Sequence, residues 1–359
     1  MSGQHVVYGF LRPFTRWMRP AHEIVILHYE SEKPPAEITE LGVTIICLPD
    51  SLKHWAKRTL WEATKLPSIV RQQKADLVLT VSGAITPNCP VPQVTLCQNP
   101  WCYVPAAHQN WQERLKARLQ RAGYAKAYRQ SAMMIYISGH LRDLYRQRNS
   151  EAKETRSEIA YVGLNEDTYQ AARELRNSAR EPFTIVSVSA MAPWKGADTL
   201  VKAVGLLRQR SIPARLKLVG PWPAASHEQD VRQLIQRLSL HDAVQILGRV
   251  SNEDLHRLYG TSQVFSLMSC CESFGIPAAE AMAFGTPIVS TNCCAIAEVC
   301  QPAGQFGPVN DPEWTANALH IALTDQQQWQ HWSNQARERA ATLTWEHCAR
   351  PFQKIPELI

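Results

Sequence analysis

Residues 269–292 of the chain read SCCESFGIPAAEAMAFGTPIVSTN, and this stretch predicts a loop, a helix and a strand in that order. Pro277 suits the first helical position, where its missing N–H group leaves no hydrogen bond unmade. Gly285 suits the end of a helix that is about ten residues long. The apolar run that follows, TPIVST, has the branched residues of a buried strand. The stretch therefore predicts an α/β unit with a tight loop ahead of its helix.

The start of the expected helix is suited to bind an anion. Residues 273–276 form a short loop whose backbone amides point along the helix start, and the helix dipole adds positive charge there. Glu272 and Glu280 would repel a phosphate, so their presence needs another partner. Hydroxyl groups beside a diphosphate would supply that partner, and this combination predicts a nucleotide-sugar site. A plain β–α–β unit with two solvated glutamates is the alternative.

A spaced pattern runs through the same stretch: Glu272, Phe274, Gly275, Glu280, Gly285, Pro287 and Ile288. It resembles the signature of the retaining glycosyltransferases of family 4, within the glycosyl transferases group 1. The resemblance implies the GT-B fold, an α/β architecture of two Rossmann-like, doubly wound domains that face a central cleft. It also implies a C-terminal helix that crosses back to the first domain. The resemblance covers residues 165–350 well and the first half only in outline.

Lys195 stands at the entrance of another expected helix, in APWKGADTLVKAV. A lysine in the first turn of a helix opposes the helix dipole, which indicates that an anion lies nearby. In the family this lysine binds the donor diphosphate, so the resemblance implies catalytic roles for Lys195 and Glu272. The donor-binding residues that the resemblance implies are Lys195, Gly220, Arg249, Val250, Glu272, Ser273, Phe274, Gly275, Ile276 and Glu280.

No metal and no cofactor are implied, and the nucleotide-diphosphate sugar is expected as a co-substrate. The sequence contains no Asp-x-Asp motif and no His/Asp cluster. Groups that are fixed before the reaction, Lys195 and the helix start at Gly275, are therefore expected to stabilise the leaving diphosphate.

The chain departs from the family pattern at three places. Gln98 and Asn99 follow an expected strand where many relatives carry a histidine that contacts the donor sugar, and Ala190 stands near a frequent arginine. The chain also goes from Ser2-Gly3 directly into a helix-like segment, so the first strand and part of the glycine loop are expected to be missing. We expect sugar or acceptor contacts from Gln98, Asn99 and Gly3, although a plain turn around Gln98 fits as well.

Short apolar runs with helical patterns between them predict a parallel sheet that is covered on both faces. The expected strands of the first half lie at 23–28, 43–48, 75–82, 93–99 and 132–139, and the second half begins with a strand at 183–190. We therefore expect an N-terminal acceptor-side domain at 1–165, a C-terminal nucleotide-sugar-binding domain at 166–343 and a crossover helix at 344–359.

Positive charge is concentrated in the first half of the chain. Residues 1–165 carry 21 lysines and arginines against 13 aspartates and glutamates, and the remaining residues carry 17 against 19. This imbalance predicts an acidic partner such as anionic lipid or a phosphate-bearing acceptor. Nucleic acid fits less well, because no aromatic–basic interleaving accompanies the charge.

The expected helix at 108–131 has Trp111, Leu115, Leu119 and Ala122 at helical spacing among many basic residues. A basic amphipathic helix can lie on a membrane surface. The alternative is a core helix whose charged face is solvated.

Cysteine usage and hydropathy predict a cytoplasmic protein that can lie peripherally on the inner face of the membrane. The ten cysteines lack paired metal-type spacing, which favours buried thiols over disulfides or zinc. No apolar run of about eighteen residues is present, so no membrane span is expected. The opening FLRPFTRWMRP is interrupted by arginines, so no signal peptide is expected either.

The function expected from these patterns is that of a retaining, metal-independent hexosyltransferase. It would move a sugar from a nucleotide-diphosphate sugar to a glycan, lipid-linked or other hydroxyl acceptor in cell-surface polysaccharide synthesis. Two alternatives stay open: a catalytically silent GT-B binding protein, and a nucleotide-sugar epimerase of the same fold.

Overall fold

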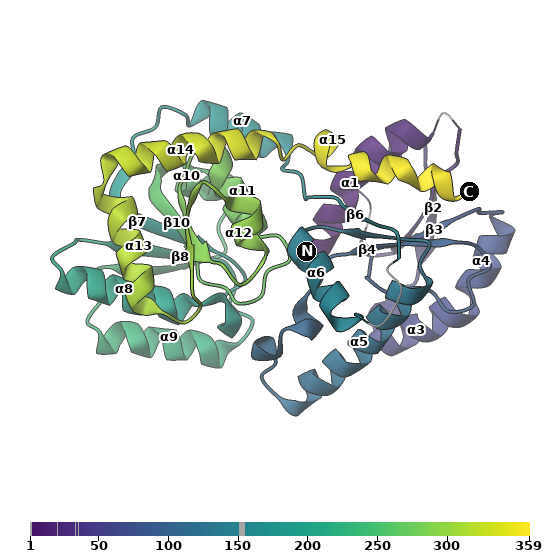
Figure 1. Ribbon diagram of the computed structural model, residues 1–359, viewed down its shortest axis with the longest axis horizontal. Coiled ribbons are helices and arrows are strands. Elements are labelled where there is room, and N and C mark those ends of the chain that lie inside the picture. The colour runs from purple at the N-terminus through teal and green to yellow at the C-terminus, as the bar shows by residue number, and fades with distance from the viewer. Residues whose placement is uncertain (1, 20, 33, 35, 151–154) are drawn as a thin grey trace. The chain divides into compact units, whose positions relative to one another are not determined.

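The computed structural model describes residues 2–19, 21–32, 34, 36–150 and 155–359 (Figure 1), without the side chains of residues 2–4, 55 and 56. The chain divides into two compact units. Unit 1 comprises Met1–Cys102, Leu115–Gly163 and Trp345–Ile359, and unit 2 comprises Tyr103–Arg114 and Leu164–Thr344. Residues 103–114 thus group with unit 2, whereas the sequence pattern placed all of residues 1–165 in one domain.

Unit 2 is built on a six-stranded parallel sheet of order β12-β11-β10-β7-β8-β9. Its strands are β7 (Glu181–Val188), β8 (Arg215–Val219), β9 (Val244–Gly248), β10 (Ser262–Leu267), β11 (Ile288–Thr291) and β12 (Gly304–Gly307). The chain builds outward from β7 to β9 and then returns to β10 on the other side of β7. The carboxyl ends of β7 and β10 therefore form the topological switch point, where open α/β sheets bind their ligands.

Helices cover both faces of this sheet (Figure 1). They are α7 (Glu166–Glu174), α8 (Ala197–Gln209), α9 (Ala225–Arg237), α10 (Asn252–Thr261), α11 (Ile276–Ala283), α12 (Ala295–Cys300), α13 (Pro312–Thr324) and α14 (Gln326–Ala341). Helices α8, α9 and α13 pack together on one face, and α7, α10, α11 and α14 pack on the other. The buried side chains of α8 and α13 join those of the strands in one apolar core.

The expected strands at 183–190 and in the TPIVST run are confirmed as β7 and β11, but β12 was not expected. Its sequence, GQFG, lacks the branched apolar residues that signal a strand. A Cβ atom at Gly304 would lie 1.8 Å from the carbonyl oxygen of Ile288, so the glycine allows β12 to approach β11.

Unit 1 contains a four-stranded parallel sheet of order β3-β4-β5-β6 and a separate parallel pair, β1-β2. The strands are β1 (Val25–Tyr29), β2 (Thr44–Leu48), β3 (Val78–Thr80), β4 (Gln93–Cys97), β5 (Met133–Tyr136) and β6 (Ser157–Ile159). The helices are α1 (Ser2–Met18), α2 (Ala36–Thr39), α3 (Trp55–Thr64), α4 (Leu66–Gln72), α5 (Trp111–Gln130), α6 (Gly139–Arg148) and α15 (Trp345–Cys348). Short 3-10 helices are η1 (Asp50–Lys53), η2 (Trp101–Tyr103), η3 (Pro105–Ala107), η4 (Pro193–Lys195) and η5 (Arg350–Leu358). Of these, η3 and η4 lie in unit 2, and η2 spans the boundary between the units.

Helices α3 and α4 follow one another with a break at Lys65. Pro67 occupies the first turn of α4, where a proline is tolerated, but it cannot continue an earlier helix. The break at Lys65 therefore has a local cause that the apolar periodicity did not reveal.

Helix α5 packs on the core of unit 1 with a face other than the apolar stripe. Its buried residues are Ala117, Tyr124, Ala127 and Tyr128. The side chains of Trp111, Leu115 and Leu119 are 70%, 51% and 58% exposed. The helix is therefore a core helix that also leaves a row of large apolar side chains exposed.

The end of the chain is a structural part of unit 1. The Trp345 ring meets the Phe10 ring edge-on, with centroids 5.1 Å apart, and Phe352 packs on Phe10 at 4.8 Å. Gly9 provides the space for this packing, because a Cβ atom there would lie 2.1 Å from the Trp345 ring. Helices α1 and α15 are thereby joined by one aromatic cluster.

We expect Trp345→Ala to lower the free energy of unfolding by about 3–5 kcal/mol, since it removes the centre of this cluster. Gly9→Val should destabilise the protein as well, because the new side chain would enter the Trp345 ring. Urea denaturation followed by tryptophan fluorescence and circular dichroism measures both effects. Gln353→Ala, an exposed change on the same C-terminal segment, is the control. A Trp345→Ala protein as stable as this control would contradict the packing.

Candidate functional site

Two loops meet at the switch point of unit 2. The first leaves β7 and runs through η4 to Gly196, and the second leaves β10 and reaches the start of α11. Gly196 has a φ of 70°, and a Cβ atom there would lie 2.3 Å from the backbone oxygen of Met268. The N–H group of Cys270 donates to the carbonyl of Trp194 at 3.0 Å. Glycine at position 196 is thus what lets the two loops touch.

Lys195 and Glu272 form an ion pair between these loops. The Lys195 Nζ atom donates to Glu272 Oε1, and the two side chains are 15% and 13% exposed. Burial lowers the pKa of Lys195, but the Glu272 carboxylate outweighs burial, and the pKa is raised above its ordinary value. Lys195 therefore stays charged, and a bound anion would compete with Glu272 for the Lys195 cation.

The start of α11 lies beside this pair, as the sequence predicted. Gly275 has a φ of 90° and caps the helix, and Pro277 is its second residue. A Cβ atom at Gly275 would lie 2.6 Å from Ile296, and the buried Phe274 side chain anchors the loop. Gly285 follows the helix with a φ of 69°, which confirms its expected role as the stop.

Glu280 is held one turn into α11 by Tyr259, a residue that the sequence did not single out. The buried Tyr259 hydroxyl donates to Glu280 Oε2 at 3.0 Å. Burial raises the pKa of Glu280 to about 7, the Tyr259 hydrogen bond opposes that rise, and the charge of Asp167 adds to it. Glu280 is thus a carboxyl group that titrates near neutral pH.

The turns after β8 and β9 also reach the carboxyl edge of the sheet. Gly220 has a φ of 130°, and its N–H group donates to the carbonyl of Gly248 at 2.7 Å. A Cβ atom at Gly220 would lie 1.8 Å from the carbonyl oxygen of Ser189, in the loop after β7. Arg249 and Val250 follow directly, so the structure brings Gly220, Arg249 and Val250 to the same edge as Lys195, Glu272 and Ser273–Ile276.

The three residues expected at the sugar or acceptor are placed in unit 1. Gln98 Nε2 donates to the Val81 carbonyl at 3.1 Å, and Asn99 Oδ1 accepts from the Trp101 N–H group at 2.9 Å. Gln98 thus ties the turn after β4 to the loop after β3, and Asn99 holds its own turn. Gly3 lies in the first turn of α1, where the structure does not describe side chains or their contacts.

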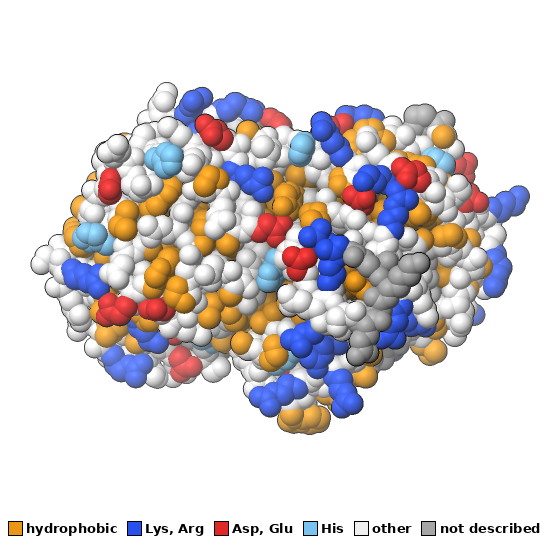
Figure 2. All heavy atoms as spheres, in the orientation of Figure 1, with side chains coloured by type: hydrophobic (Ala, Val, Ile, Leu, Met, Phe, Trp, Pro, Cys, Tyr) orange, Lys and Arg blue, Asp and Glu red, His pale blue; other side chains and the backbone are white. Residues whose placement is uncertain are grey.

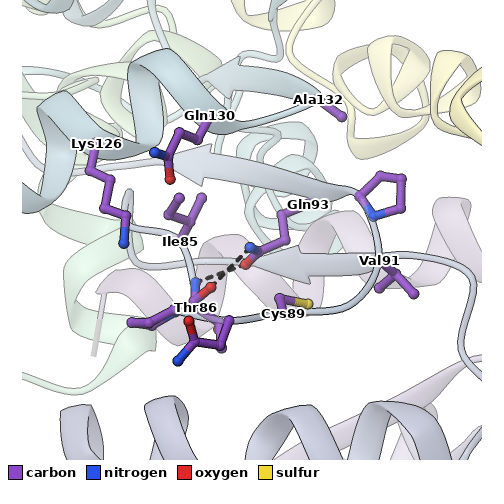
Figure 3. A pocket seen from close by; sticks show the side chains of 11 residues that line it. Ile85, Thr86, Cys89, Val91, Gln93, Lys126, Gln130 and Ala132 are labelled. Atoms are coloured by element: carbon purple, nitrogen blue, oxygen red, sulfur yellow. Dashed lines mark hydrogen bonds between the residues drawn. The ribbon is translucent and has the colours of Figure 1, made fainter.

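A cavity of about 280 Å³ in unit 1 is a less convincing ligand site (Figure 3). Gln93 spans its wall: it accepts from the Thr86 N–H group at 2.8 Å and donates to the Thr86 carbonyl at 3.0 Å. Lys126 and Gln130 of α5 also line it. The cavity lies at the amino ends of β4 and β5, whereas ligands of open α/β sheets collect at the carboxyl ends.

Two further findings concern metals and membranes. Within the described part of the chain, no group of three or more histidine, cysteine, aspartate or glutamate side chains is placed to hold a metal ion. Among the described helices, none combines the length and the apolar character needed to cross a membrane.

We expect Glu280→Gln to stabilise the protein at alkaline pH and to have little effect at acidic pH. The pKa of Glu280 is raised from 4.5 to about 7 by folding, so the folded protein holds an extra proton between these values. Stability is therefore lost as the pH rises through this window, on the order of 1–3 kcal/mol, and the glutamine cannot ionise. Melting temperatures across that window measure the effect, with the exposed Glu253→Gln as control. An equal shift on both sides of the window would contradict the assignment.

Part of the chain is similar in sequence to known glycosyltransferases. Residues 169–339 match the family described as Glycosyl transferases group 1. A D-inositol 3-phosphate glycosyltransferase of Jonesia denitrificans is 30% identical over 202 residues, which cover 54% of this chain and 47% of that protein. The O-antigen chain mannosyltransferase B of Escherichia coli is 30% identical over 165 residues, covering 45% of this chain and 42% of that protein. The chain thus spans about half the length of the curated relatives it matches.

Solved structures resemble the whole chain. Anabaena Alr3699/HepE, solved in complex with UDP and glucose, aligns with a TM-score of 0.73 at 17% identity over 100% of this chain and 96% of its own. WaaG, a glycosyltransferase involved in lipopolysaccharide biosynthesis, aligns with a TM-score of 0.72 at 16% identity over 97% of this chain and 94% of its own. At these identities the likeness shows the fold. The chain therefore has the GT-B fold, and its residues 169–339 are similar to the domain described as Glycosyl transferases group 1.

Proposed function

We propose that this protein is a glycosyltransferase that moves a sugar from a nucleotide-diphosphate sugar to a hydroxyl acceptor. The observation that carries the proposal is the Lys195–Glu272 ion pair at the switch point, beside the amino terminus of α11. A cation, a helix dipole and a carboxylate within one small region suit a ligand that has both a diphosphate and sugar hydroxyls.

The relatives support a role in the synthesis of surface glycans. The Escherichia coli relative is an O-antigen chain mannosyltransferase, and WaaG is a glycosyltransferase involved in lipopolysaccharide biosynthesis. The Anabaena protein was solved with UDP and glucose, which favours a nucleotide sugar as the donor. We therefore propose a hexosyl donor and a glycan or lipid-linked acceptor in polysaccharide biosynthesis.

Lys195 would stabilise the leaving diphosphate during the reaction. When the donor binds, its phosphates would take over the Lys195 Nζ atom, and the Glu272 carboxylate would be released to accept hydrogen bonds from sugar hydroxyls. Negative charge that develops on the diphosphate would then face a cation and a helix dipole already in place. We propose that the reaction retains the anomeric configuration, with the leaving phosphate oxygen helping to deprotonate the acceptor on the same face.

A catalytically silent GT-B binding protein is the second candidate. The observation in its favour is that the Gln98 and Asn99 side chains are engaged by the backbone of unit 1, at Val81 and at Trp101. Release of nucleotide from a panel of UDP-, GDP- and ADP-sugars, after a thermal-shift screen with the same donors, separates the two candidates. Donor binding without nucleotide release in the presence of varied acceptors would favour the silent protein.

We expect Lys195→Ala to lower kcat on the order of 100-fold, because its contact with the diphosphate strengthens as charge develops. Glu272→Gln should change both turnover and donor-sugar choice. Glu280→Gln should mainly raise the donor KM, because ribose contacts persist through the reaction. Steady-state kinetics with one identified donor test these effects, with Lys202→Ala, an exposed change further along α8, as the control. Full activity in Lys195→Ala and Glu272→Gln would overturn the catalytic assignment.

We also propose that α5 docks on an anionic membrane surface. The exposed Trp111, Leu115 and Leu119 side chains lie on a helix that also carries the exposed basic residues Arg114, Lys116, Arg118, Lys126 and Arg129. Figure 2 shows lysine and arginine side chains around hydrophobic ones at the lower edge of the view, where Figure 1 places α5. Apolar side chains flanked by cations suit the interface of a membrane with anionic lipids.

We expect binding to vesicles that contain phosphatidylglycerol to weaken as salt rises. Each nearby basic residue contributes about 1 kcal/mol to such binding, so Arg118→Glu with Arg121→Glu should weaken it at least about tenfold. Leu115→Ser with Leu119→Ser should weaken it by removing apolar contact. Arg257→Glu, an exposed change on α10, is the matched control. Equal binding to neutral vesicles, or binding to neither kind, would rule out this docking.

A further inference from the structure

Four cysteines lie together at the carboxyl ends of β10 and β11. Cys270 and Cys271 follow β10, and Cys293 and Cys294 follow β11. The parallel register pairs Leu267 with Ser290, and Cys270 and Cys293 each stand three residues beyond this pair. Both cysteines thus lie in neighbouring loops, which extend from strands whose spacing is about 4.8 Å.

The thiols of one loop lie against the backbone of the other loop. The Sγ atoms of Cys293 and Cys294 lie 3.7 and 3.6 Å from the carbonyl oxygen of Ser269, the residue before Cys270. All four are free thiols; Cys293 is exposed, Cys270 is half-buried, and Cys271 and Cys294 are buried. The exposed thiol thus sits over a loop that carries a second, partly accessible thiol.

Cys293 is also the thiol best prepared to react. The hydrogen bond from Cys294 lowers the pKa of Cys293 to about 7; burial opposes this effect, and Thr291 and the backbone add smaller lowering contributions. The thiolate is the nucleophilic form of cysteine, so a lowered pKa favours reaction at Cys293 over the other thiols. Cys294 stays protonated, because donating to Cys293 raises its pKa.

The same two loops hold the Lys195–Glu272 pair. The Cys270 N–H group donates to the carbonyl of Trp194, the neighbour of Lys195, at 3.0 Å. The Glu272 carbonyl accepts from the Ala295 N–H group, next to Cys294, at 3.4 Å. A new covalent bond between the loops would therefore act on backbone that positions both members of the pair.

We propose that Cys293 is an oxidation site, which reacts with hydroperoxides, forms a disulfide with Cys270 and thereby disables the Lys195–Glu272 site. The Cys293 thiolate attacks the peroxide oxygen, an S–O bond forms as the O–O bond breaks, and water or an alcohol leaves after protonation. The Cys270 sulfur then attacks the sulfenic acid, an S–S bond forms, and a second water leaves. The two thiols are oxidised by two electrons in total, and one peroxide is reduced.

Cys270 is the partner because Cys294 is poorly placed for a disulfide. Adjacent residues have Cα atoms about 3.8 Å apart across a trans peptide, below the usual range of about 4.4–6.8 Å for a disulfide. The spacing of neighbouring strands falls within that range, and the loops of Cys270 and Cys293 extend from two such strands. The effect on the site rests on the proposed function, whereas the thiol chemistry does not.

Peptide mapping by mass spectrometry tests the chemistry alone. With limiting iodoacetamide at neutral pH, Cys293 should be alkylated about tenfold faster than Cys47, the other exposed cysteine. With hydrogen peroxide, a Cys270–Cys293 disulfide should form and reverse with dithiothreitol. In Cys270→Ser, the sulfenic acid should persist on Cys293 and react with dimedone. Equal alkylation of Cys47 and Cys293, or no Cys270–Cys293 disulfide, would overturn the proposal.

The consequence for the site is measured separately. Peroxide should reduce the thermal shift given by UDP, or by whichever nucleotide stabilises the protein, by at least half in the parent and in Cys47→Ser. Cys293→Ser and Cys270→Ser should keep the full shift. A disulfide that forms while the nucleotide shift is unchanged would overturn the control of the site. Absence of any nucleotide shift before oxidation would instead count against the proposed function.

Discussion

The ion pair between Lys195 and Glu272 is the interaction around which unit 2 is arranged. It joins loops from β7 and β10, which lie side by side only because the sheet reverses its strand order between them. Gly196 makes the contact possible, since any side chain there would collide with the backbone of Met268. A charged pair at this depth is weak evidence for stability, because desolvation offsets much of the attraction. Its place at the switch point fits a role in ligand binding better.

Glu280 likewise does not stabilise the fold in its charged form. Its raised pKa means that folding disfavours the charged carboxylate, and only the Tyr259 hydroxyl compensates for this. Hydrogen bonds from Arg180 join the elements that surround Glu280. Arg180 donates to the carbonyls of Tyr259 and Ser262, both at 2.9 Å, and to Thr286 Oγ1 at 2.7 Å. One partly buried guanidinium thus connects α10, β10 and the turn after α11, and it holds the elements that carry Glu280 and Tyr259.

Helix α5 and the cysteine cluster add two surfaces that the sugar chemistry does not require. The buried side of α5 consists of alanines and tyrosines, while a tryptophan and two leucines are exposed to solvent among basic residues. Such a row is costly to expose unless a partner covers it. The cysteines place an ionisable thiol on the loops of the proposed donor site. Together these features would couple sugar transfer to a membrane surface and to oxidants.

The sequence by itself determined the elements whose signals are local. Pro277 and Gly285 marked the limits of α11, branched apolar runs marked the strands, and the glutamate pattern pointed to the region of the site. Tertiary structure decided which distant residues meet: Lys195 with Glu272, Tyr259 with Glu280, and Cys293 with the backbone of Ser269. It also decided which face of α5 is buried. Helix ends depend on residues within a turn of each other, whereas contacts at a sheet edge depend on strand order and register, which no short stretch of sequence contains.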